Sequence, residues 1–206
     1  MKKYWVYLKY VLEHKKNVFI ECCKAGLLVH AFTHDLSKFC LTEFIGFANY
    51  DFNGENSKVD TQRFNKAWQH HKDRNKHHWD YWSERNLEMP NKYVNQMICD
   101  WKAMGRKFGN TVQEFYLKNY DKMELAHGVR LSIETKLGLQ FFHCCECDQV
   151  YWMTCREIIE DAIKIKKNRP QRYSDELTLE WIDKIDSEFG IDMLSLLGYK
   201  REDVEK

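Results

Sequence analysis

Residues that interrupt regular structure are scarce in this chain, and this scarcity restricts its fold more than any other feature. Only nine glycines and two prolines occur in 206 residues. Glycine loosens the backbone and proline removes a hydrogen-bond donor, so both gather in turns. A sheet protein needs many tight turns, whereas long helices need few. We therefore expect an all-α fold.

Apolar side chains recur at three- and four-residue intervals, which is the spacing of one helix face. Residues 4–24 show this pattern before Gly26, and residues 91–108 show it after Pro90. A glycine after a helix and a proline before one are common boundary signals. Further helices are expected from residue 42 onward and over 61–71, 112–120, 129–142, 150–167, 175–189 and 193–197, with loops at 51–60 and 168–172.

The length of the chain allows one substantial hydrophobic core. We expect a single helical bundle over residues 1–120, which carries the chemistry. Residues 121–206 are expected to form a helical extension that packs on the bundle, covers its site as a lid or contributes to oligomerisation. The sequence leaves a homodimer open.

The charge of the chain is balanced, with 32 basic and 31 acidic residues. No overall field therefore favours extended nucleic acid or an anionic membrane as a partner. The sequence has no run of about 18 apolar residues, and Met-Lys-Lys-Tyr-Trp at its start is not followed by the apolar region of a secretory signal. We expect a cytoplasmic protein with no membrane partner.

Eight cysteines occur, and the expected reducing compartment favours free thiols over disulfides. The segment 143–147 reads His-Cys-Cys-Glu-Cys, and thiols with imidazole suit zinc. Because no second cysteine pair follows at zinc-finger spacing, helix packing is the favoured interpretation. Whether Cys144, Cys145 and Cys147 bind metal stays open.

One local motif carries chemistry: His34 and Asp35 are adjacent, and Lys38 follows three residues later. An aspartate in this position can also cap a helix, so the motif alone decides little. Three further polar residues lie among apolar neighbours on predicted helix faces: His14 (Val11, Val18), His71 (Phe64, Trp68) and Asp100 (Met97, Met104). A single inward histidine is usually a hydrogen-bonded core residue. A buried carboxylate, however, needs a cation or several donors, so we hypothesise that these residues converge.

Imidazole nitrogen and carboxylate oxygen together suit divalent Mn, Fe, Co, Ni or Zn. Such a set holds one or two ions with positions left open to water, whose pKa the ion lowers. The sequence therefore predicts a metal centre with one or two divalent transition-metal ions.

The order of these residues resembles the HD superfamily of metal-dependent phosphohydrolases, in which a His, a His-Asp pair and a late Asp lie on successive helices. His34-Asp35-Leu-Ser-Lys38 is similar to the form found in two-metal members. The resemblance implies that Asp35 bridges two ions and that Lys38 meets the substrate phosphate. It also implies a primary ion held by His34, Asp35, Asp100 and either His14 or His71, and a second ion held by His71 and His78. The stretch 34–109 is further similar to an uncharacterised family of bacteria and their phages.

Two-metal HD enzymes usually carry one more histidine between the His-Asp pair and the paired histidines, and this chain has none there. Glu43 is a substitute ligand, although a glutamate in a first helical turn is ordinarily exposed. His70, His77 and His78 are others, and His77 or His78 is an alternative phosphate contact. Arg74 is a further candidate for phosphate binding, against a solvated surface arginine.

The sequence thus predicts an enzyme, a phosphoric ester hydrolase, with Asp35, Lys38 and Asp100 as catalytic residues. Its substrate would be a small phosphate ester, and nearby tryptophans could stack a nucleobase, although tryptophans at helical spacing usually build a core. Two alternatives stay open. One is a catalytically silent HD-like module that binds a nucleotide or a partner protein, and the other is a di-iron oxygenase.

Overall fold

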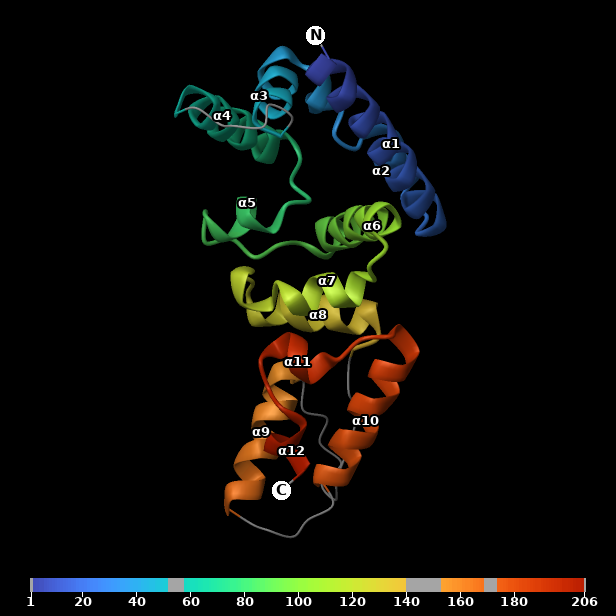
Figure 1. Cartoon of the computed structure of the whole chain (residues 1–206), viewed down its shortest axis with the longest axis vertical. Coiled ribbons are helices and arrows are strands. Elements are labelled where there is room, and N and C mark those ends of the chain that lie inside the picture. The colour runs from blue at the N-terminus through green and yellow to red at the C-terminus, as the bar shows by residue number, and fades with distance from the viewer. Residues whose placement is uncertain (1, 52–57, 140–152, 169–173, 206) are drawn as a thin grey trace. The chain divides into compact units, whose positions relative to one another are not determined.

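The computed structural model describes residues 2–51, 58–139, 153–168 and 174–205. Within these ranges every regular element is helical, with twelve α-helices and two short 3-10 helices (Figure 1). The predicted all-α fold is confirmed. Cysteines 144, 145 and 147 and most of the predicted loops at 51–60 and 168–172 lie outside the described residues.

The chain divides into two units, residues 1–109 and 110–206. The first unit contains α1 (Lys2–Lys24), α2 (Leu28–Thr33), η1 (Leu36–Phe39), α3 (Leu41–Asp51), α4 (Lys58–Arg74), α5 (Trp79–Ser83) and α6 (Asn91–Phe108). The second unit contains α7 (Val112–Lys118), η2 (Tyr120–Lys122), α8 (His127–Leu137), α9 (Cys155–Asn168), α10 (Ser174–Phe189), α11 (Met193–Leu197) and α12 (Arg201–Glu205). A functional division at residue 120 stays a prediction.

Helix α1 is the central helix of unit 1, because it packs against α2, α3 and α6. One face of α1 contributes Tyr7 and Val11 to a cluster with α3 and α4, and Val18 and Cys22 to a second cluster with α2 and α6. Burying such side chains is the main favourable term in folding, at about 25 cal/mol per Å² of apolar surface. His14 lies on the same inward face of α1 and is buried. In the sequence it stands between the α1 residues of the first cluster and those of the second.

Helices α3 and α4 approach each other closely at Gly46. A Cβ atom at this position would lie 2.6 Å from the Cβ atom of Ala67 and 3.0 Å from the carbonyl oxygen of Arg63. Only glycine avoids both contacts without moving a backbone. This close packing brings the start of α3 against the end of α4, where the paired histidines lie.

The helix boundaries at Gly26 and Pro90 are confirmed, and Gly26 adopts the left-handed conformation with φ of 72°. The predicted end of the fourth helix at His71 is wrong, because α4 continues to Arg74. The reason is Lys72, which is buried and pairs with Asp80 and Glu84 after the turn that follows α4. A polar residue that is itself buried and has charged partners does not end a helix.

Five described cysteines are free thiols: Cys22, Cys23, Cys40, Cys99 and Cys155. Among the described residues, no helix has the length and apolar character needed to cross a bilayer.

Candidate metal centre

Asp35 lies at the break between α2 and η1, where the backbone turns sharply. Its φ of 53° and ψ of 28° place it in the left-handed region. This region is costly for residues other than glycine, although aspartate and asparagine tolerate it best. The turn directs the carboxylate inward, and only 4% of the residue is exposed. Strained backbone of this kind is retained where the surrounding structure holds it, often at functional sites.

A first donor group joins α1, the end of α2 and α6, and consists of His14, His34 and Asp100. The Nε2 atom of His14 lies 3.0 Å from Oδ1 of Asp100 and 3.3 Å from Nε2 of His34. The Nε2 atom of His34 lies 3.8 Å from the same Oδ1 atom. Three residues that are far apart in sequence therefore present their donor atoms to one point.

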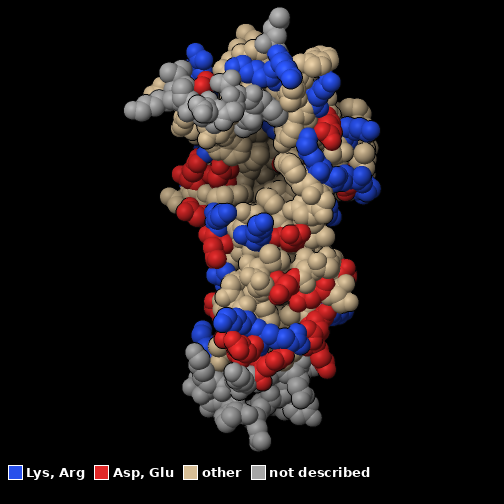
Figure 2. Space-filling model, in the orientation of Figure 1, with Lys and Arg blue, Asp and Glu red and all other residues tan. Residues whose placement is uncertain are grey.

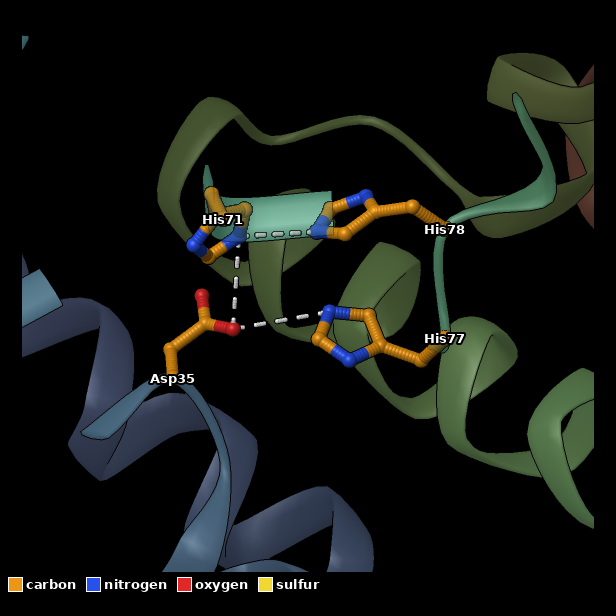
Figure 3. A group of neighbouring side chains, drawn as sticks. All are labelled: Asp35, His71, His77 and His78. Carbon is orange, nitrogen blue, oxygen red and sulfur yellow. Dashed lines mark hydrogen bonds and ion pairs between the residues drawn. The ribbon is translucent and has the colours of Figure 1, made fainter. Parts of the chain in front are cut away.

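A second donor group consists of Asp35, His71, His77 and His78 (Figure 3). The Oδ1 atom of Asp35 lies 3.5 Å from Nε2 of His71 and 3.6 Å from Nε2 of His77. The Nε2 atoms of His71 and His78 are 2.9 Å apart. His71 comes from the last turn of α4, whereas His77 and His78 come from the turn before α5.

These separations match those of ligands that share one ion. Metal–nitrogen and metal–oxygen bonds of about 2.1 Å place neighbouring ligand atoms about 3.0 Å apart in octahedral and about 3.4 Å apart in tetrahedral coordination. The separations given above run from 3.0 Å to 3.8 Å in the first group and from 2.9 Å to 3.6 Å in the second, and all ligand atoms of a group lie within 4.8 Å of one another. Both groups can therefore accept a divalent ion after small side-chain rotations.

Several of the donor atoms are buried without a hydrogen-bond partner. They include Oδ1 of Asp35 and Nε2 of His77. Leaving such an atom unpaired costs about 1–3 kcal/mol, and more when the group is charged. A cation at the point where these atoms meet removes this cost, so the residues fit a metal ion on the evidence of their own geometry.

The electrostatics of the two carboxylates favour cation binding. Burial opposes ionisation of Asp35, but the nearby His34 and Lys38 hold its pKa well below the usual value. Burial also opposes ionisation of Asp100, yet a hydrogen bond and the charge of His14 hold the pKa of Asp100 below its usual value. Both carboxylates are therefore ionised at neutral pH, as metal ligands must be.

The histidines of the turn are held neutral. Burial is the largest cause that lowers the pKa of His77 well below its usual value, and burial likewise lowers the pKa of His78 to about 3. A neutral imidazole keeps a lone pair on one ring nitrogen, which is the form that binds metal.

Glu43 does not join either donor group, but it orients one of the ligands. It is completely buried, so the alternative of an exposed glutamate in the first turn of a helix is wrong. Its Oε2 atom lies 2.8 Å from Nδ1 of His71 and accepts a hydrogen bond from Ser37. An Nδ1–H donated to Glu43 leaves the Nε2 lone pair of His71 facing Asp35, an arrangement typical of metal-binding histidines.

His30 lies beside the centre and was not predicted from the sequence. Its Nε2 atom lies 3.3 Å from Nδ1 of His34, and its ring also contacts His77 edge-on. Burial is the largest cause that lowers the pKa of His30 to about 4. The signal was available, because His30 and His34 are four residues apart and such residues share a helix face.

The cationic residues predicted to bind phosphate lie in two different settings. The Nζ atom of Lys38 is 2.7 Å from Oδ2 of Asp35, at the edge of the centre. Arg74 is exposed, and its Nε atom donates to Nε2 of His70 at 2.8 Å. Figure 2 shows a hollow in the surface of unit 1, with acidic side chains on one side and basic side chains on the other. Substrate binding by Lys38, Arg74, His77 and His78 stays a prediction.

Comparison with known proteins gives a family but no activity. The chain belongs to a family of unknown function, DUF5662, whose model matches residues 3–142. Every residue of both donor groups lies within that range. Comparisons with curated proteins and with solved structures each found no match. The resemblance to the HD superfamily therefore stays a prediction.

Proposed function

We propose that this chain is a metal-dependent phosphohydrolase that acts on a nucleotide or another small phosphate ester. The observation that carries the proposal is the pair of neighbouring donor groups, in which buried carboxylate and imidazole atoms meet without hydrogen-bond partners. A bound divalent ion would supply activated water near neutral pH and polarise a phosphate oxygen. The remaining chemistry falls to the side chains of the chain itself.

Asp35 has the position expected of a residue shared by two ions. Its Oδ2 atom faces Nε2 of His34 at 3.2 Å, whereas its Oδ1 atom faces His71 and His77. One oxygen is therefore directed toward the first donor group and the other toward the second. This geometry supports two ions, with His14, His34 and Asp100 around one and His71, His77 and His78 around the other.

Lys38 is the residue that we assign to the substrate. The side chain of Lys38 is 17% exposed and its ammonium group lies against Asp35, so the residue can contact both solvent and the centre. A compact cation in this place neutralises charge on a phosphate oxygen as the ester bond breaks. A cation held by Asp35 would compete with Lys38 for this carboxylate and would leave the ammonium group available to the substrate.

The first experiment measures metal and turnover together. Protein purified without chelator should contain one or two equivalents of transition metal by elemental analysis, and it should hydrolyse members of a panel of nucleotides, phosphate monoesters and phosphate diesters. Asp35→Asn should lose both metal and turnover, because it removes the charge that faces both groups. Asp73→Asn is the matched control, because Asp73 is exposed on α4, pairs with Arg85 and Gln69, and belongs to neither donor group.

Three results separate the hypotheses. Turnover retained by Asp35→Asn at the wild-type rate would refute the proposed centre. A sample without metal, and without stimulation by Mn, Ni or Co, would favour the silent binding module. A metal-loaded sample that consumes oxygen but hydrolyses no ester would favour the oxygenase.

A further inference from the structure

A third set of potential ligands lies outside the two donor groups. Cys40, Glu43 and His70 each offer one ligand atom, and these atoms all lie within 4.8 Å of one another. The Oε1 atom of Glu43 is 2.6 Å from Nδ1 of His70, and Sγ of Cys40 is 4.0 Å from the same nitrogen. Cys40, Glu43 and His70 belong to neither donor group. Glu43 orients the ligand His71 through its Oε2 atom, whereas its Oε1 atom faces His70.

The fold brings these residues together for a local reason. Cys40 immediately precedes α3, and Glu43 lies three residues later, so both project from the same side of its first turn. His70 is on the last turns of α4, which the close approach at Gly46 holds against α3. Cys40 and His70 are half-buried, whereas Glu43 is completely buried. Glu43 is therefore shielded from solvent, whereas Cys40 and His70 are partly accessible to it.

The chemistry of the set is that of a zinc ligand set. A thiolate and a carboxylate offset the two charges of a divalent cation, and a neutral imidazole adds no charge. In a tetrahedral site, bonds of about 2.3 Å to sulfur and about 2.05 Å to nitrogen place these two atoms about 3.6 Å apart. The observed 4.0 Å between Sγ and Nδ1 therefore needs to shorten only slightly. The contact between Glu43 and His70 would lengthen as the ion replaces the shared proton.

Arg74 must lose its hydrogen bond to His70 when Nδ1 of His70 binds a metal ion. Its Nε–H donates to Nε2 of His70, and this nitrogen carries the proton when Nδ1 binds a metal. Arg74 is exposed, so turning its side chain into water costs little, in the range of about 0–1 kcal/mol for an exposed contact.

We propose that Cys40, Glu43 and His70 form a separate site for a zinc-class divalent cation, with a fourth position open to water. On binding, the Cys40 thiol releases its proton to solvent as the sulfur–metal bond forms. The site is coupled to the metal centre because Oε2 of Glu43 accepts from His71 while Oε1 faces His70. By linkage, any factor by which an ion at this site changes the affinity of the metal centre is also the factor by which an ion at the metal centre changes the affinity of this site.

The test uses cadmium as a thiolate-sensitive probe. Cd²⁺ is titrated into the chelator-treated full chain, and the ultraviolet charge-transfer absorbance of cadmium–thiolate bonds is recorded. Cys40→Ser should lose the part of this band that belongs to one thiolate, and it should weaken the associated Cd²⁺ binding by more than the roughly 10–100-fold typical of losing an outer contact. His70→Ala should keep a weakened band, because the thiolate is still present.

Cys23→Ser is the matched control, because Cys23 is a half-buried thiol on α1 that belongs to none of the ligand sets. Both serine variants retain the other cysteines of the chain, so their difference isolates Cys40. An identical band in wild type and Cys40→Ser, or an equal loss in both serine variants, overturns the proposal. Mn²⁺ binding is measured in parallel, because this ion avoids thiolates and reports on the metal centre alone. If the wild-type chain binds no Mn²⁺ but still shows the Cys40-dependent cadmium band, the proposed function is refuted and this site stands.

Discussion

Returning a divalent ion to metal-free protein should raise the thermal stability of unit 1. The buried Oδ1 atom of Asp35 and the buried Nε2 atom of His77 have no hydrogen-bond partner in the folded chain. The ions that the two donor groups bind have no equivalent sites in the unfolded chain, because the ligands of each group come from separate segments of the chain. Binding to the folded state alone stabilises it by mass action.

The size of the effect follows from this linkage. A free ion concentration of 100 times the dissociation constant adds about 2.7 kcal/mol to the free energy of unfolding. For a domain of about 100 residues, 1 kcal/mol shifts the melting temperature by about 4 °C or more. The melting temperature should therefore rise by about 10 °C between chelator-treated and ion-saturated protein.

The assay is thermal unfolding followed by circular dichroism, with and without Mn²⁺, and the informative variant is Asp35→Asn. Asparagine tolerates the left-handed backbone at this position, so the variant changes charge and leaves the turn intact. Its ion-dependent shift should fall close to zero, while Asp73→Asn keeps the full shift. Equal melting temperatures for wild-type protein with chelator and with saturating Mn²⁺, Co²⁺, Ni²⁺ or Zn²⁺ would show that the donor groups are not a metal centre.

Three further outcomes follow from single contacts. Glu43→Gln should weaken metal binding about 10–100-fold, measured by competition with a chelator, because the amide no longer fixes the Nδ1–H of His71; unchanged affinity would contradict this role. Lys72→Met should lower the free energy of unfolding in urea by about 1–3 kcal/mol, because it leaves the partly buried carboxylate of Asp80 unpaired; a stability equal to wild type would show that the pair contributes nothing. Burial raises the pKa of Glu134 in the folded chain, so the folded state holds this proton more tightly and its stabilising contribution falls as pH rises above the unfolded pKa. Glu134→Gln should therefore show a smaller loss of unfolding free energy than wild type between about pH 4.3, the ordinary pKa, and neutral pH; parallel curves would refute the assignment.

The parts of the fold that the sequence predicts well are those encoded by local periodicity. In α1 the face that carries Val11 and Val18 is buried, and this face also predicts that His14 is buried, whereas the apolar side chains of Trp5 and Leu12 are exposed. The distinction between His70 and His71 follows from the same rule, because only His71 lies on the buried side of α4. In each case the information is contained within a few neighbouring residues.

The contacts that the sequence does not predict depend on how helices pack. Glu43 occupies a first helical turn, where acidic residues are ordinary because they favour the helix dipole. Nothing near it in sequence shows that α4 covers it. The cause is the close approach of α3 to Ala67 at Gly46, which is a property of two helices together. The orientation of His71 by Glu43 therefore emerges only when the packing is known.

The same distinction explains why adjacent residues His34 and Asp35 can serve one centre. Successive side chains in a helix point about 100° apart, and in a strand they point to opposite faces, so regular structure separates neighbours. Here α2 ends at Thr33, His34 leaves the helical conformation with ψ of 125°, and Asp35 turns into the left-handed region. This break brings Nε2 of His34 and Oδ2 of Asp35 within 3.2 Å while the other Asp35 oxygen faces His71 and His77. The adjacency of the two residues thus indicates an interruption of helix as much as a pair of ligands, and the interruption is what allows one carboxylate to face both donor groups.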